Sequence, residues 1–197
     1  MTSRSFRATL AVALALASAG AATIGDARSA PAAANAAIGP AIGTRIAIDA
    51  ALIDSSGRKT TLAAVAHGKP IMIVLFRSAK WCPYCQGQLK SLGPVAAAAK
   101  AKGVGFIAVS YDSPADLAAF AAKQSLTFPL YSDTGSKMID ALKLRDPRYA
   151  LDSFANGVPY PTTLLIDTTG IVKGKTVETD YKIRPTNADL IAMLAKV

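Results

Sequence analysis

Two cysteines three positions apart are the residues of this chain whose types and spacing most clearly suggest chemistry. Cys82 and Cys85 are its only cysteines, and they stand in the segment WCPYC at 81–85. The apolar, branched run 70–76 before them predicts a buried strand, and residues 86–92 favour a helix. A Cys-x-x-Cys pair at a strand-to-helix junction is typical of a thiol–disulfide redox motif.

The predicted position of Cys82 explains how its thiol could become reactive. At a helix N-terminus, unpaired backbone N–H groups and the helix dipole favour an anion. This setting lowers a thiol pKa from about 8.5 toward or below neutrality, and Arg77 and Lys80 add positive charge nearby. Positions three apart share a helix face, so Cys85 is expected to attack a mixed disulfide formed on Cys82.

Three other interpretations of the cysteine pair compete with redox chemistry. A zinc site needs about four ligands, whereas the chain offers two cysteines and one histidine, His67, which is expected in a solvent-facing loop. A purely structural disulfide would close a loop of about four residues and contribute roughly 2 kcal/mol, less than the ~3 kcal/mol of a fifteen-residue loop. Two buried, inert thiols are the third alternative. Redox chemistry is the preferred interpretation.

The N-terminal segment has the sequence pattern of an export signal. Arg4 and Arg7 precede an apolar stretch of about ten residues, and small residues follow it. This order is typical of a secretory signal peptide, and the stretch is too short for a membrane span of about twenty residues. We expect a signal peptide at 1–22, an Ala- and Pro-rich disordered tether at 23–41 and one domain at 42–197. Cleavage after Ala19, Ala22 or Ala30 and an uncleaved membrane anchor remain alternatives.

Charge and cysteine content indicate the compartment and exclude some partners. The formal net charge is +9, and removal of residues 1–30 takes away three arginines and one aspartate, leaving +7. The basic residues are scattered without interleaved aromatic residues, so no nucleic-acid-binding face is predicted, and no stable membrane insertion is expected. An exported chain with one cysteine pair fits an oxidising compartment. We therefore expect a periplasmic or secreted protein.

Hydrophobic periodicity and turn signals predict the elements that position the motif. The prediction is an α/β domain with a mixed central sheet. Its elements are a hairpin of 51–54 and 58–62, a helical turn at 62–66, the strand 70–76, a helix to about 101 kinked by Gly93-Pro94, a strand at 104–110, a helix capped by Ser113 to 123, a strand at 128–131, a helix at 137–144, a loop at 145–158, a hairpin of 162–167 and 171–175, and a helix at 187–196.

These elements and motifs make residues 42–197 resemble the thioredoxin-fold superfamily, and within it the peroxiredoxin-like AhpC/TSA (redoxin) family. The resemblance rests on WCPYC after a buried strand and on PTTLLID at 161–167. It implies a three-layer thioredoxin-like fold in which the N-terminal hairpin is an extension. It also implies that Pro161 is cis and lies against the disulfide, that Tyr160 offers a backbone edge to an incoming chain, and that Trp81 packs over the motif. Pro159 is the alternative to Pro161.

The sequence departs from peroxiredoxins proper at two positions. These proteins carry Thr or Ser three residues before the reactive cysteine and Pro seven residues before it, where this chain has Ala79 and Leu75. Ser78 is one position away from the missing hydroxyl. Arg77 and Arg184 are the candidates for the family's active-site arginine.

The preferred functional hypothesis is an exported thiol–disulfide oxidoreductase with a role in redox homeostasis, which uses Cys82 and Cys85 and needs neither a cofactor nor a metal. The alternative is a thiol-dependent peroxidase in which Cys82 is oxidised to a sulfenic acid and Cys85 condenses with it. Expected partners are thiols, disulfides or peroxides, and a reducing protein. A third hypothesis is a copper-handling chaperone, since thiolates select Cu(I).

Overall fold

The computed structural model describes residue 1, residue 35, residues 37–149 and residues 151–197. The predicted signal peptide, apart from Met1, and most of the predicted tether therefore lie outside the described residues. Within the described part of the chain, no helix is both long enough and apolar enough to cross a membrane.

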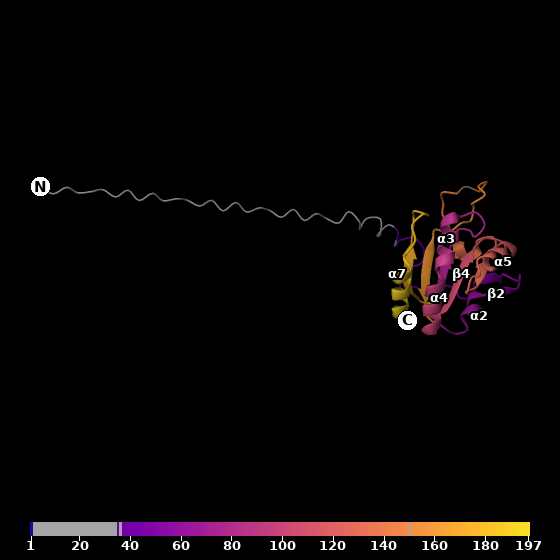
Figure 1. The fold of residues 1–197 in the computed structure, drawn as a ribbon, viewed down its shortest axis with the longest axis horizontal. Coiled ribbons are helices and arrows are strands. Elements are labelled where there is room, and N and C mark those ends of the chain that lie inside the picture. The colour runs from indigo at the N-terminus through magenta and orange to yellow at the C-terminus, as the bar shows by residue number, and fades with distance from the viewer. Residues whose placement is uncertain (2–34, 36, 150) are drawn as a thin grey trace.

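A seven-stranded mixed sheet forms the centre of the described domain (Figure 1). The strand order is β2-β1-β5-β4-β3-β6-β7. The strands are β1 (Ala51–Asp54), β2 (Lys59–Thr61), β3 (Ile71–Leu75), β4 (Gly105–Ser110), β5 (Leu130–Ser132), β6 (Thr162–Ile166) and β7 (Val172–Val177). Strands β3, β4 and β5 run parallel, and the other pairings are antiparallel. The predicted α/β class, the mixed sheet and the N-terminal hairpin are thus confirmed.

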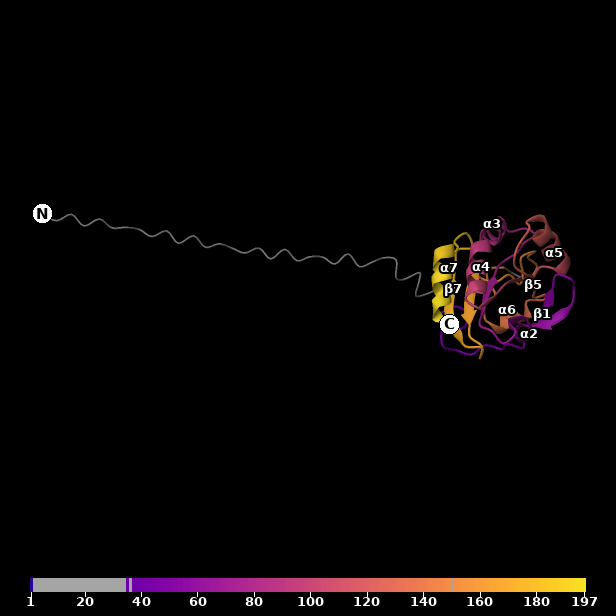
Figure 2. The same cartoon turned by 60° about the horizontal axis from the view of Figure 1, so that its bottom comes forward.

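Helices cover both faces of the sheet and complete three layers (Figures 1 and 2). They are α2 (Leu62–Ala66), α3 (Pro83–Ser91), α4 (Gly93–Ala101), α5 (Pro114–Lys123), α6 (Lys137–Ala141) and α7 (Asn187–Met193), which continues into a 3₁₀ turn at Leu194–Lys196. Apolar residues of α3, α4, α5 and α7 pack in one core against the sheet. Residues of α2 and α6 form the core on the other face.

The side chains of β3 alternate between these two cores. Met72 and Val74 belong to the core that contains both cysteines, whereas Ile71, Ile73 and Leu75 belong to the opposite one. All five residues are buried, as expected of a central strand covered on both faces. Because β3 is packed on both faces, its C-terminal end holds the start of the β3–α3 loop in a fixed position.

Two boundaries differ from the sequence-based prediction. The kink expected at Gly93-Pro94 is a break between two helices, because α3 ends at Ser91 and Pro94 lies in the first turn of α4, where its missing N–H costs nothing. The packed part of the chain also starts before Ile42. Ile38 packs against the core on the α6 side, and its carbonyl oxygen accepts a hydrogen bond of 2.9 Å from Lys175 Nζ.

Candidate functional site

Cys82 and Cys85 form a disulfide at the start of α3. Cys82 is the N-cap residue, its Sγ accepts the Cys85 N–H at 3.3 Å, and Pro83 is the first helical residue. A proline is favoured there, because its ring presets the helical φ angle and the N–H that it lacks would be unpaired in any case. Cys82 is 1% exposed and Cys85 is fully buried. The structure therefore places both sulfurs where the sequence predicted, but beneath the surface.

Asp112 holds the loop between β3 and α3. Its carboxylate accepts hydrogen bonds from Ser78 Oγ at 2.7 Å, from the Ala79 N–H at 2.6 Å and from Ser110 Oγ at 2.9 Å. Burial raises the pKa of Asp112, and these hydrogen bonds oppose the rise. Ser78 Oγ also accepts the N–H groups of Lys80 and Trp81 at 2.9 and 3.2 Å. The Ser78 hydroxyl is thus committed to this loop and does not replace the hydroxyl missing at Ala79.

Trp81 is partly buried and packs against the core cluster that contains both cysteines. Its Nε1 donates to the Tyr111 hydroxyl at 3.0 Å, and its ring meets Phe154 edge-on with a centroid distance of 5.1 Å. Phe154 belongs to the loop 145–158 and is 77% exposed. A hollow of about 400 Å³ opens beside these rings, lined by Lys80, Trp81, Tyr111, Asp112, Ser113, Asp116 and Phe154.

Lys80 engages a partner outside the disulfide. Its ammonium pairs with Asp116 Oδ1 at 3.3 Å, and both side chains are partly exposed. Asp116 is in the first turn of α5, where Ser113 caps the helix. Among the described contacts of Lys80, none is with a sulfur atom.

Arg77 is a buried cation surrounded by aromatic rings. It is 1% exposed, and its Cζ lies 4.4 Å from the centroid of Tyr149, 5.0 Å from Tyr181 and 5.6 Å from Trp81. Its Nη1 pairs with Asp146 Oδ2 at 3.2 Å, while its Nε has no hydrogen-bond partner among the described residues. Arg77 therefore brings a positive charge to the site and connects the β3–α3 loop with two later loops.

Asp146 and Arg148 join those two loops. Arg148 donates to both carboxylate oxygens of Asp146, at 2.8 and 2.7 Å, and its Nη2 also donates to the Thr179 carbonyl at 2.7 Å. Burial alone would raise the pKa of Asp146, but the hydrogen bonds and charge of Arg148, together with Arg77, hold that pKa below its usual value. The loops 145–158 and 178–186 are thereby tied together at the end of the sheet where α3 begins (Figure 1).

Arg184 contacts the disulfide directly. Its Nη2 donates to Cys85 Sγ at 3.2 Å, and its Nε donates to Gln88 Oε1 at 2.7 Å. Burial, and after it the charge of Arg77, lowers the pKa of Arg184 to about 10, so the guanidinium stays charged at neutral pH. Of the two arginines considered as the family's active-site arginine, Arg184 is the one that has a described contact with a sulfur atom.

The resemblance was wrong about the geometry of Pro161. No peptide bond of the described residues is cis, and the chain around Pro161 is extended instead. The Tyr160 N–H donates to the Leu144 carbonyl at 2.8 Å, and the Tyr160 carbonyl accepts from Thr162 Oγ1 at 2.9 Å. The predicted backbone edge at Tyr160 is therefore already occupied by this chain's own residues. Pro159, the alternative, forms an isolated bridge with Arg145.

Sequence reasoning missed the loops that cover the motif. The sequence assigned no role to Asp146, Tyr149 and Tyr181, which contact Arg77, or to Arg148, which pairs with Asp146. The only signal was an unusual mix of charged and aromatic residues in a loop without hydrophobic periodicity. His67, by contrast, is an exposed residue at the C-terminal end of α2, as predicted.

Comparison with known proteins decides the family. The model of the AhpC/TSA family matches residues 44–175, which is about two thirds of the chain. The chain belongs to the AhpC/TSA family. It is thus a peroxiredoxin-like oxidoreductase of the thioredoxin fold, and the predicted resemblance is confirmed.

Solved structures of peroxiredoxins share the fold of this AhpC/TSA-family protein. The peroxidoxin BcpB of Mycobacterium tuberculosis is 20% identical with a TM-score of 0.68, and the match covers 81% of this chain and 98% of that one. Peroxiredoxin Q of Xanthomonas campestris is 25% identical with a TM-score of 0.59, covering 75% and 89%. A peroxiredoxin-like protein of Aquifex aeolicus is 17% identical with a TM-score of 0.68, covering 81% and 90%. No match was found among curated proteins.

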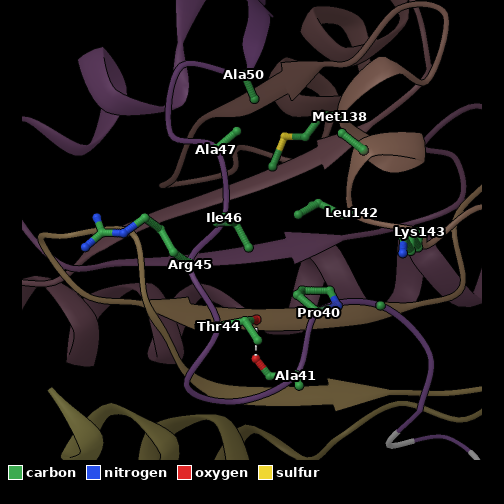
Figure 3. Close-up of a pocket in the computed structure, with 12 residues that line it drawn as sticks. Pro40, Ala41, Thr44, Arg45, Ile46, Ala47, Ala50, Met138, Leu142 and Lys143 are labelled. Carbon is green, nitrogen blue, oxygen red and sulfur yellow. Dashed lines mark hydrogen bonds between the residues drawn. The ribbon is translucent and has the colours of Figure 1, made fainter.

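A separate pocket of the AhpC/TSA domain lies away from the cysteines. It has a volume of about 420 Å³ and is formed by the segment 39–50 and α6 with the residues after it (Figure 3). Apolar side chains such as Ile46, Met138 and Leu142 line it, and the Thr44 hydroxyl already donates to the Ala41 carbonyl at 2.6 Å. This pocket holds neither cysteine.

Proposed function

We propose that this protein is an exported thiol-dependent peroxidase in which Cys82 reacts with the peroxide and Cys85 resolves the product. The Cys82 thiolate attacks the terminal oxygen of a hydroperoxide, the O–O bond breaks, and Cys82 becomes a sulfenic acid. The leaving oxygen takes up a proton from solvent and departs as water or an alcohol. The Cys85 sulfur then attacks Cys82, and water leaves as the disulfide forms. A low-molecular-weight thiol, rather than a protein, is the external reductant, and it is oxidised to a disulfide as it returns both cysteines to thiols.

The burial of both sulfurs in an AhpC/TSA-family fold is the observation that carries this proposal. A protein disulfide would have to reach Cys82 past the loops above it, and the edge at Tyr160 on which a chain could pair is occupied. A hydroperoxide needs only a narrow path, because its reacting end is two oxygen atoms. Burial thus favours the peroxidase over the disulfide exchange that the sequence suggested.

The electrostatics of the site support the same proposal. The N-terminus of α3 stabilises an anion at Cys82, and the guanidinium groups of Arg77 and Arg184 add positive charge around the pair. A thiolate is the form that attacks peroxide. Reduction of alkyl peroxides is named for the bacterioferritin comigratory protein of Xanthomonas campestris, whose fold is similar, so alkyl hydroperoxides should be tested beside hydrogen peroxide.

Stopped-flow fluorescence can test the proposal directly. Trp81 is the only tryptophan, and it precedes Cys82, so its emission should change when the reduced protein is oxidised. We expect a rate that is proportional to peroxide concentration and far above that of a free thiol. Cys82→Ser should abolish the reaction, whereas Cys85→Ser should still form a sulfenic acid but no intramolecular disulfide. A wild-type rate no faster than that of free cysteine would refute the proposal.

Thiol–disulfide exchange remains the second candidate function, because Ala79 supplies no hydroxyl to the peroxide and Ser78 is bonded to Asp112. Reduction of insulin disulfides by the dithiol form measures this activity. Fast insulin reduction combined with slow peroxide oxidation would reverse the order of the two candidates.

A further inference from the structure

We infer that Arg184 is a catalytic residue that stabilises the Cys85 thiolate, so that Cys85 is the leaving group when a thiol reductant attacks the disulfide at Cys82. This inference rests on the proposed peroxidase function and assigns a chemical direction to its reduction step. Arg184 lies nine residues beyond the part of the chain that the AhpC/TSA model matches, so the family match itself assigns Arg184 no role.

The guanidinium of Arg184 is held in one orientation. Its Nη1 donates to the carbonyl groups of Tyr181 and Ile183 at 2.5 and 2.6 Å, and its Nε donates to Gln88 at 2.7 Å. These acceptors fix the plane of the group, and Nη2 then meets Cys85 Sγ at 3.2 Å. An arginine fork that is already oriented loses little freedom when it binds an anion.

No carboxylate of the described residues lies within ion-pairing distance of Arg184. Glu178 and Asp180 are the acidic residues whose charges act on it, and Arg77 is the neighbouring cation. The positive charge of the guanidinium is therefore not neutralised by an ion pair and can stabilise a neighbouring anion. Cys82 has a different stabilising group, because its sulfur accepts the Cys85 N–H at the start of α3.

The different groups that stabilise the two sulfurs decide which sulfur is attacked and which one leaves during reduction. The thiolate of the external reductant attacks Cys82 Sγ, and a new sulfur–sulfur bond forms between them. The Cys82–Cys85 bond breaks, and its electron pair stays on Cys85 as a thiolate beside Arg184. A leaving thiol with a lower pKa departs faster. A second reductant thiol then releases Cys82 as a thiolate, and the reductant leaves as its disulfide.

Titration of Cys85 in a Cys82→Ser protein tests the contact without any peroxidase activity. Thiolate formation is followed by ultraviolet absorbance as the pH is raised, with Arg184 intact, with Arg184→Gln and with Arg184→Lys. An opposite charge nearby shifts such an equilibrium by about tenfold or more. We expect Arg184→Gln to move the midpoint upward by at least about one pH unit and Arg184→Lys to restore part of the shift.

Lys182→Gln is the matched control, because it removes the same charge from the same loop without a described contact to a sulfur atom. The midpoint of the Cys85 titration in the Lys182→Gln variant should stay close to that of the Cys82→Ser protein with Lys182 intact. Equal midpoints for Arg184→Gln and Lys182→Gln would overturn the assignment, even if the wild-type protein proves to be a fast peroxidase. Conversely, a slow reaction with peroxide would remove the proposed function while leaving this measurement valid.

The direction of attack can be read from the oxidised wild-type protein. A brief reaction with glutathione, an acid quench and alkylation leave glutathione on the attacked cysteine and the alkyl group on the one that left. Fragmentation of the peptide 81–90 locates both groups. Glutathione on Cys82 is expected, and glutathione mainly on Cys85 would refute the inference.

Discussion

Substitution of Asp146 by asparagine should destabilise the protein strongly, because it removes the negative charge that faces Arg77. The Asp146 side chain is fully buried, and that of Arg77 is 2% exposed, so water cannot replace the lost partner. Breaking a buried ion pair by removing one partner costs about 3–5 kcal/mol. For a chain of this size, about 1 kcal/mol lowers the melting temperature by roughly 2–4 °C. We expect a fall of about 6–20 °C.

Thermal unfolding of the oxidised full-length protein, followed by circular dichroism at neutral pH, measures this effect. Asp140→Asn is the matched control. Asp140 also pairs with an arginine, Arg145, at 2.5 Å, but the two side chains are 47% and 32% exposed. Partly exposed pairs contribute about 1 kcal/mol or less, so the control should melt within a few degrees of the wild type.

Equal and small decreases in melting temperature for Asp146→Asn and Asp140→Asn would refute the reasoning. They would show that the buried charge of Arg77 does not need Asp146 as its partner. A double substitution provides a second check. Replacing both partners by apolar residues, as in Arg77→Met with Asp146→Leu, removes the unpaired charge and is often neutral or stabilising relative to a buried pair. We expect the double variant to melt above Asp146→Asn.

Three further results are expected. Because hydrogen bonds and charge lower the pKa of Asp146, its contribution to stability is present above the unfolded-state pKa of about 3.9 and is lost as the pH falls through the lower folded-state value. Urea unfolding at several acidic pH values should therefore show that the free energy of unfolding falls less with decreasing pH for Asp146→Asn than for the wild type. Parallel plots of this free energy against pH would contradict the prediction. Ser113→Ala removes the side-chain cap on the Asp116 N–H at 3.1 Å and should cost about 1 kcal/mol in the same assay, whereas no change would mean that α5 needs no cap. Leu89→Ala empties a fully buried position in the core around the cysteines and should cost about 2–5 kcal/mol; a loss below about 1 kcal/mol would show that this core can collapse around the gap.

Local sequence patterns were sufficient to predict the frame of the site. The continuous apolar run before Cys82 predicted β3, and the Ser113-Pro114 signal predicted the start of α5. The position of Cys82 at the N-terminus of α3 also followed from its neighbours. In each case the residues that decide the structure lie within a few positions of one another.

The environment of the sulfurs could not be predicted in this way. The contact of Arg184 with Cys85 joins residues 99 positions apart, and that of Arg77 with Asp146 joins residues 69 positions apart. Neither pair has a periodic pattern that could reveal it, because both depend on how two loops lie over the end of the sheet. The expected geometry of Pro161 failed for a different reason: it was carried over from other proteins, and the extended pairing of Tyr160 does not require it.

Helix α3 begins at Pro83 while Cys82 and Cys85 are joined, so the disulfide is compatible with an intact first helical turn. For a peroxidase, Cys85 would attack a sulfenic acid three positions away at the start of the same helix, and such an intramolecular step has a large advantage over one that requires a second molecule. Overoxidation of the sulfenic acid to a sulfinic acid requires a second peroxide molecule. An enzyme with this geometry is expected to resist inactivation when peroxide is abundant.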